Sequence, residues 1–204
     1  MLNLVVGPSG CGKTHFIKEL LRNSREPFIL SSIYGEEYKE ISENVVLHKV
    51  NSFSQVKKGI NLEEEREIIF STNNSSNIKL VFPYLLRKLS NEEDLFRYTL
   101  VFEESFFYIT QNIFNYLLRL SRMVDIYIIT HTTYDFECFL DNLTISQINI
   151  ITSKKALSEK NTSKFLLTNF GIKINRFIEY NDYDWFKINI DSFEKIHLGE
   201  KNAS

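Results

Sequence analysis

Short apolar runs separated by polar segments recur along most of the chain. Leu2 to Val6 is one such run, and it ends at Gly7-Pro8, which indicates a strand buried on both faces of a parallel sheet. From Lys13 to about Asn23 the apolar residues instead recur at helical spacing, which predicts an amphipathic helix. A strand, a tight turn and a helix are therefore expected at the start of the chain.

Further apolar or β-rich runs follow at intervals that leave room for helices between several of them. This alternation favours an α/β fold, with a mostly parallel sheet, helices on both faces and a small β-rich C-terminal extension. A helix is predicted from Ser105 to Arg122, and two β-rich runs that flank Asn181-Asp182 predict a hairpin between Asn175 and Ile190. The predicted strands are Phe28 to Ser31, Val45 to Val50, Glu67 to Ser71, Tyr98 to Phe102, Ile126 to Thr130 and Gln147 to Ile151.

Length and composition limit the number of domains and the cellular setting. With 204 residues, 43% of them hydrophobic, the chain suits a single domain, in which residues 1–151 form the main core and 152–204 a basic segment and hairpin. The net charge of -2 means that any nucleic-acid surface must be local. Cys11 and Cys138 argue against a disulfide framework, and no run approaches the roughly 18 apolar residues of a membrane span. We therefore expect a cytoplasmic protein without membrane insertion.

The segment Gly7-Pro8-Ser9-Gly10-Cys11-Gly12-Lys13-Thr14 matches the pattern G-x-x-x-x-G-K-[ST] of a phosphate-binding loop. In such a loop the glycines let the backbone curl, so that N–H groups point at phosphate oxygens, and the next helix adds its positive dipole end. We expect Lys13 to bridge the β- and γ-phosphates of ATP and Thr14 to place its hydroxyl on Mg²⁺. Cys11 is interpreted as a small residue that fills a variable position. The predicted nucleotide-binding residues are Ser9, Gly10, Cys11, Gly12, Lys13, Thr14 and His15.

Hydrolysis of ATP also needs a carboxylate near the magnesium ion and a group that activates water. Among the predicted strands only Tyr98 to Phe102 runs directly into paired carboxylates, Glu103-Glu104, in the h-h-h-h-[DE]-E form of a Walker B motif. We expect Glu103 to bind Mg²⁺ and Glu104 to activate water. The first acid of this motif is usually Asp, and Glu103 is longer by a methylene. The alternative is that both acids are exposed and favour the N-terminus of the following helix.

His131 directly follows the predicted strand Ile126 to Thr130, so it should reach the same carboxyl edge of the sheet as the acids. It is therefore a candidate sensor of the γ-phosphate, and the alternative is an ordinary hydrogen-bonded surface residue. On the helix before this strand, Arg119 and Arg122 lie on a polar face away from the apolar stripe. Either arginine is a candidate finger that acts on the site of a neighbouring subunit, and the alternative is a solvated helix face.

The order of these motifs, from the phosphate loop through Leu100 to Glu104 and the arginine-bearing helix to Ile129-Thr130-His131, resembles that of the FtsK-HerA superfamily of DNA-pumping ATPases. The resemblance covers roughly residues 1–150 and is greatest to the compact viral genome-packaging branch, including that of archaeal internal-membrane icosahedral viruses. The sensor strand of that family typically ends in Thr-Gln, whereas this one ends in Thr-His.

This resemblance implies a RecA-like (ASCE) P-loop NTPase that hydrolyses ATP with Mg²⁺. It also implies a homo-oligomeric ring of roughly five or six subunits. Such a ring threads double-stranded DNA, independently of its sequence, into a viral capsid, in contact with capsid or portal-vertex proteins. The expected location is the host cytoplasm or the virion vertex.

A local basic segment is a candidate DNA contact, because lysines and arginines bind phosphates without reading bases. Between Ser153 and Arg176, six basic residues stand against the single acid Glu159, although such a run can also be an ordinary solvated turn. These basic residues are Lys154, Lys155, Lys160, Lys164, Lys173 and Arg176.

Two other functions remain open at this point. A small P-loop nucleotide kinase would share the loop and the chain length, although no arginine-rich lid or acceptor site is evident. A nucleotide-regulated DNA-binding or helicase-loader module would use ATP chiefly to control association.

Overall fold

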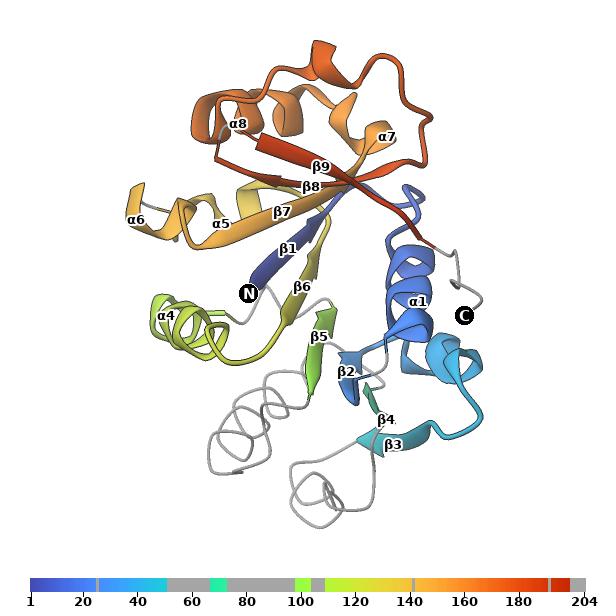
Figure 1. The fold of residues 1–204 in the computed structure, drawn as a ribbon. Coiled ribbons are helices and arrows are strands. Elements are labelled where there is room, and N and C mark those ends of the chain that lie inside the picture. The colour runs from blue at the N-terminus through green and yellow to red at the C-terminus, as the bar shows by residue number, and fades with distance from the viewer. Residues whose placement is uncertain are drawn as a thin grey trace.

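The computed structural model describes residues 1–24, 26–50, 67–72, 98–103, 109–140, 142–190 and 192–198. The strands are β1 (Leu2–Val6), β2 (Phe28–Ser32), β3 (Val46–Val50), β4 (Glu67–Thr72), β5 (Thr99–Glu103), β6 (Ile126–Thr130), β7 (Ile148–Ser153), β8 (Trp185–Asn189) and β9 (Ser192–Ile196). Within the described residues they form one sheet with the order β3-β4-β2-β5-β6-β1-β7-β8-β9 (Figure 1). The first seven strands in this sheet order, from β3 through β1 to β7, pair in parallel, whereas β8 pairs antiparallel with β7 and β9. The predicted fold class is confirmed.

Helices cover both faces of this sheet (Figure 1). Phe16 of α1 (Lys13–Asn23) and Tyr38 of η1 (Gly35–Ile41) pack in the core on one face. The core on the other face contains Phe114 of α4 (Gln111–Leu120), Phe136 of α5 (Tyr134–Glu137) and Phe165 of α8 (Lys160–Phe170). The described helices are α1 (Lys13–Asn23), η1 (Gly35–Ile41), α4 (Gln111–Leu120), α5 (Tyr134–Glu137), α6 (Asn142–Ile145), α7 (Lys154–Leu157), α8 (Lys160–Phe170) and η4 (Ile174–Phe177). None of the helices in this described part is both long and apolar enough to cross a lipid bilayer.

A buried amide pair connects β1 to β7 within the otherwise apolar centre of the sheet. Asn149 Nδ2 donates a hydrogen bond to Asn3 Oδ1 at 2.9 Å, and the two residues lie opposite each other in the parallel register. Asn3 Nδ2 also lies 3.3 Å from the carbonyl oxygen of Ile126 on β6 and donates to it. These bonds satisfy polar groups that would otherwise be costly to bury.

The predicted hairpin between Asn175 and Ile190 is wrong, because the hairpin is formed by β8 and β9 instead. Residues Asn181 and Asp184 form a turn that leads into β8: Asp184 N donates to the Asn181 carbonyl at 3.0 Å, and Asn181 N donates to Asp184 Oδ2 at 3.0 Å. Before this turn, the β-rich run from Asn175 belongs mainly to the short helix η4 and its following turn. Phe177 of η4 is buried, so tertiary packing outweighs its strand propensity.

The helix predicted from Ser105 to Arg122 is confirmed from Gln111 to Leu120, whereas residues 109 and 110 are not helical. Helix α4 begins at Gln111 because the Thr110 hydroxyl accepts a hydrogen bond from Ile113 N at 3.4 Å, which caps the N-terminus. It ends at Leu120, and the chain turns before β6. Residues 104–108 lie outside the described residues, so the start of the prediction is not tested.

Candidate nucleotide-binding site

The phosphate loop connects β1 to α1 at the carboxyl edge of the sheet. Gly10 and Gly12 have φ angles of 75° and 93°, in the left-handed region that residues with a Cβ rarely adopt. Gly12 immediately precedes α1 and has no side chain with which to cap it. The first amides of α1 are therefore oriented toward the loop, as an anion-binding helix N-terminus requires.

Gly7 is constrained by packing and not by a positive φ. A Cβ at Gly7 would lie 2.5 Å from Cys11 Sγ and 3.1 Å from Ala156 Cβ. Cys11 has an exposed fraction of 0%, so its thiol lies beneath the loop and fills the space next to α7. The side chain at position 11 is therefore more restricted than its variable place in the motif indicates.

Lys13 and His131 meet above the loop. The Lys13 ammonium donates hydrogen bonds to the carbonyls of Gly7 and Pro8, the second at 3.0 Å, and its Nζ lies 3.3 Å from His131 Nδ1. His131 reaches this point because β6, which it follows, is the direct neighbour of β1. The two residues are far apart in the sequence but adjacent in the structure. The sensor role of His131 stays a prediction.

Glu103 ends β5 at the same edge and is buried, with an exposed fraction of 4%. Its Oε2 accepts a hydrogen bond from the hydroxyl of Ser32, at the end of β2, and Ser32 Oγ accepts one from Tyr34 N at 2.8 Å. Because β6 separates β5 from β1, the two strand ends are about 10 Å apart across the sheet. Glu104 lies outside the described residues, so its predicted role is untested.

Tyr38 of η1 lies near both Glu103 and Thr14. Burial raises the pKa of its hydroxyl, and the negative charge of Glu103 raises it further, so Tyr38 stays a neutral O–H donor. Its oxygen makes no hydrogen bond to another described residue. A buried, unsatisfied hydroxyl beside a carboxylate and a threonine hydroxyl indicates room for a further polar group. Mg²⁺ prefers such oxygen ligands, so Thr14 and Glu103 fit the ion that the motif implies.

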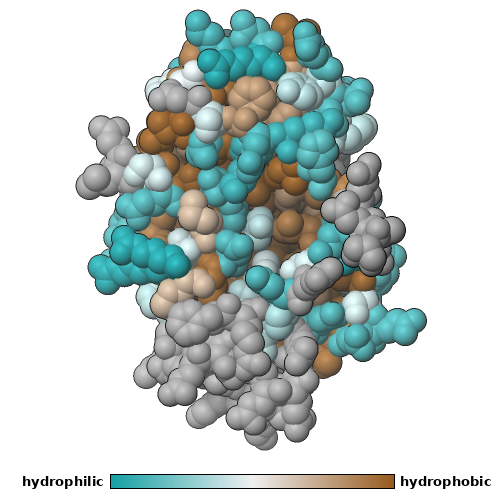
Figure 2. All heavy atoms as spheres, viewed as in Figure 1, coloured by the Kyte–Doolittle hydropathy of each residue, from teal (hydrophilic) through white to brown (hydrophobic). Residues whose placement is uncertain are grey.

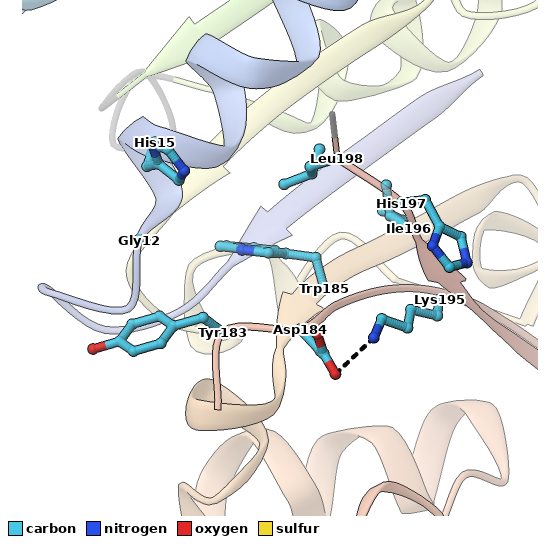
Figure 3. A pocket seen from close by; sticks show the side chains of 9 residues that line it. All are labelled: Gly12, His15, Tyr183, Asp184, Trp185, Lys195, Ile196, His197 and Leu198. Carbon is cyan, nitrogen blue, oxygen red and sulfur yellow. Dashed lines mark ion pairs between the residues drawn. The ribbon is translucent and has the colours of Figure 1, made fainter. Parts of the chain in front are cut away.

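A cavity of about 590 Å³ adjoins the loop on the opposite side of β1 from Glu103 (Figure 3). Gly12 and His15 form its loop-side wall, and Tyr183, Trp185 and His197 line it from the C-terminal hairpin. His15 was predicted to bind nucleotide, whereas the hairpin residues were not. The available signal was the single tryptophan of the chain at the start of a β-rich run.

Two of the six basic residues predicted to contact DNA bind the protein's own backbone. Lys154 donates to the carbonyls of Ile178 and Tyr180, the first at 3.1 Å, and Lys155 donates to the Gly10 carbonyl at 3.0 Å. Lys155 therefore supports the phosphate loop. Lys155 is nevertheless exposed, as are the four basic residues that remain, Lys160, Lys164, Lys173 and Arg176.

The predicted arginine fingers lie at the C-terminal end of α4. Arg119 and Arg122 are both exposed, in agreement with the predicted polar face of this helix. An action on a neighbouring subunit stays a prediction, because the structure holds one chain.

Comparison with known proteins supports the fold. No model of a known protein family and no curated protein sequence matches the chain. The structure of the genome packaging NTPase B204 from Sulfolobus turreted icosahedral virus 2, in complex with ATP-gammaS, is similar with a TM-score of 0.60 at 14% identity, covering 95% of each chain. VirB4 of Thermoanaerobacter pseudethanolicus is similar with a TM-score of 0.65 at 10% identity, covering 98% of this chain and 90% of that one. The chain therefore has the P-loop NTPase fold that its motif order indicated, similar to a viral genome-packaging NTPase and to VirB4.

Proposed function

We propose that this chain is a Mg²⁺-dependent ATPase. The observation that carries the proposal is the convergence of Lys13, Glu103 and His131 at one carboxyl edge of the sheet, from three separate parts of the sequence. A phosphate-binding loop, a buried carboxylate and a polar residue on the strand between them are the parts that phosphoryl transfer from ATP requires.

Each of these residues has a defined task in the proposed reaction. Lys13 supplies positive charge to the β- and γ-phosphates, and the amides of the loop and of α1 hold their oxygens. Thr14 and Glu103 hold Mg²⁺, which when bound neutralises charge on the same phosphates. His131 contacts the γ-phosphate beside Lys13, and Glu104 orients and activates the attacking water.

We further propose that the chain works as a homo-oligomeric ring that moves double-stranded DNA into a viral capsid. Three observations support this: the fold is similar to that of a genome packaging NTPase, the arginines of α4 are exposed, and α8 and η4 carry exposed basic residues. Hydrophilic side chains dominate the surface over α8 and the segment after it, with hydrophobic residues among them (Figure 2). Phosphate contacts of this kind are independent of DNA sequence.

ATP turnover by the assembled protein, measured with Mg²⁺ and with or without double-stranded DNA, tests the proposal. Lys13→Ala should abolish nucleotide binding, whereas Glu104→Gln should retain binding and lose turnover. Arg22→Ala is a matched control on the same helix, because Arg22 is exposed and its surface ion pair with Glu19 contributes little.

Three results would separate the candidate functions. Absence of hydrolysis by the assembled wild-type protein in the presence of DNA contradicts the motor. Phosphate transfer to a nucleoside or nucleotide favours a kinase. Unimpaired function of Glu104→Gln favours a nucleotide-regulated binding module.

A further inference from the structure

We infer that the β8–β9 hairpin completes the nucleotide site by binding the base and ribose of ATP in the cavity next to the loop. The inference rests on the proposed ATP binding and adds where the nucleoside half of the molecule lies. The cavity has a volume of about 590 Å³, within the range of roughly 300–1,000 Å³ of small-molecule sites.

The strand order determines the direction in which the nucleotide lies. Glu103 and His131 follow β5 and β6, on one side of β1, whereas the cavity lies over β8 and β9, on the other side. A triphosphate with its γ-phosphate near Lys13 and His131 therefore extends its α-phosphate and nucleoside away from the acidic strand. That path leads past Gly12 and His15 into the cavity.

Two aromatic rings line the cavity next to Gly12. Tyr183 and Trp185 both extend toward Gly12 (Figure 3), and a Cβ at Gly12 would lie 3.9 Å from each ring. Trp185 is 3% exposed and stacks on Phe16 of α1, with ring centroids 4.5 Å apart and an interplanar angle of 28°. The Trp185 ring is therefore held in place by the helix that follows the phosphate loop.

Tyr183 is 64% exposed, and its ring is the part of this lining that a ligand can cover. The Lys155 ammonium lies 5.5 Å from the centroid of the Tyr183 ring and donates to the Gly10 carbonyl at 3.0 Å. Lys155 thus contacts both the exposed Tyr183 ring and the loop, and this contact positions the ring for stacking with a base. Aromatic bases stack on such rings with little dependence on base identity.

Charged groups occupy the other end of the cavity. Lys195 Nζ lies 2.9 Å from Asp184 Oδ2 (Figure 3). Burial opposes ionisation of Asp184, but the hydrogen bonds from Lys195 and from Asn181 N outweigh it and hold the pKa of the carboxyl below its usual value. Asp184 is therefore ionised at neutral pH and can accept hydrogen bonds from ribose hydroxyls.

Affinities for ATP and for inorganic tripolyphosphate, both with Mg²⁺, distinguish the nucleoside contact from the phosphate contact. Calorimetric titration of wild type and Tyr183→Ala should show roughly tenfold or greater loss of ATP affinity and no change for tripolyphosphate. Tyr183→Phe should retain ATP affinity, because it keeps the ring. Ile178→Ala is the control, because this residue is also exposed, lies in the same segment and does not line the cavity.

Tryptophan fluorescence gives an independent measurement, because Trp185 is the single tryptophan of the chain. ATP should change its emission, whereas tripolyphosphate should not. The inference is overturned if Tyr183→Ala binds ATP as tightly as wild type or weakens tripolyphosphate equally. If wild type binds neither ligand, the ATPase proposal fails as well; if ATP binds with the expected dependence on Tyr183 but is not hydrolysed, only the ATPase proposal fails.

Discussion

Replacing Gly7 with alanine tests whether packing constrains the start of the phosphate loop. The new Cβ would lie 2.5 Å from Cys11 Sγ, well inside an ordinary contact, and 3.1 Å from Ala156 Cβ. Because Cys11 is fully buried, its sulfur has little free space into which it can move. Overpacking of this kind costs about 1–3 kcal/mol of unfolding free energy. We expect a loss of about 2 kcal/mol and weaker ATP binding.

A second substitution shows which neighbour is responsible. Cys11→Ala removes the sulfur, after which the remaining close neighbour of the new Cβ is Ala156 at 3.1 Å. The double variant should therefore be more stable than the sum of the two single changes predicts, with a coupling of about 1–2 kcal/mol. Gly10→Ala is the control, because its added Cβ meets no atom within 4 Å but its φ of 75° penalises any residue with a Cβ. We expect a cost of about 1–2 kcal/mol without rescue by Cys11→Ala.

Urea unfolding without nucleotide, at one protein concentration, measures all of these free energies. Calorimetric ATP titration of the same variants measures the effect on the loop. The reasoning is refuted if Gly7→Ala is as stable as wild type, if Cys11→Ala fails to rescue it, or if Cys11→Ala rescues Gly10→Ala equally.

Three further predictions concern the acid, the arginines and the basic surface. Ser32→Ala removes a hydrogen bond to the Glu103 carboxylate, worth about 1.5–3 kcal/mol, so the Mg²⁺ concentration for half-maximal turnover should rise; an unchanged Mg²⁺ titration would contradict this. Arg119→Ala and Arg122→Ala should each change the unfolding free energy by less than about 0.5 kcal/mol, while one of them lowers turnover of the assembled protein by about 10³-fold or more. Mixing that variant with Lys13→Ala subunits should restore some activity, because the Lys13→Ala subunit supplies the missing arginine to its neighbour. Equal turnover of both variants and wild type would exclude an arginine finger at these positions. Lys164→Ala should reduce the magnitude of the slope of log binding constant against log salt concentration by about 0.9. An unchanged slope would show that Lys164 of α8 does not contact DNA.

The sequence predicted the start of the fold well because local signals there agree with tertiary packing. The apolar run of β1, the loop glycines and the amphipathic pattern from Lys13 to Asn23 all point to the same strand, turn and helix, and α1 has these bounds in the structure. At the C-terminus the signals conflict. Asn181-Asp182 is indeed a turn, but it leads from η4 into β8, because Phe177 is buried against the sheet.

The candidate site was predictable where residues follow a motif and unpredictable where topology creates the contact. Lys13 follows from the loop pattern, and Glu103 follows from a strand that runs into acids. The contact between Lys13 and His131 depends on β6 lying between β1 and β5, an order that periodicity does not specify. Ser32 and Tyr38 have no motif, and they reach the site because β2 neighbours β5 and η1 follows β2.

The asparagine pair between β1 and β7 makes strand alignment specific in a way that an apolar sheet centre would not. A shift of β1 by a single residue would leave both amides among hydrocarbon side chains without their partners, whereas a run of valines and isoleucines tolerates such a shift more easily. In the observed alignment Val6 lies opposite Thr152, so the loop after β1 and the helix after β7 start at the same height. That common height lets Lys155 reach Gly10, which means that two amides in the centre of the sheet set the distance between the loop and its supporting lysine.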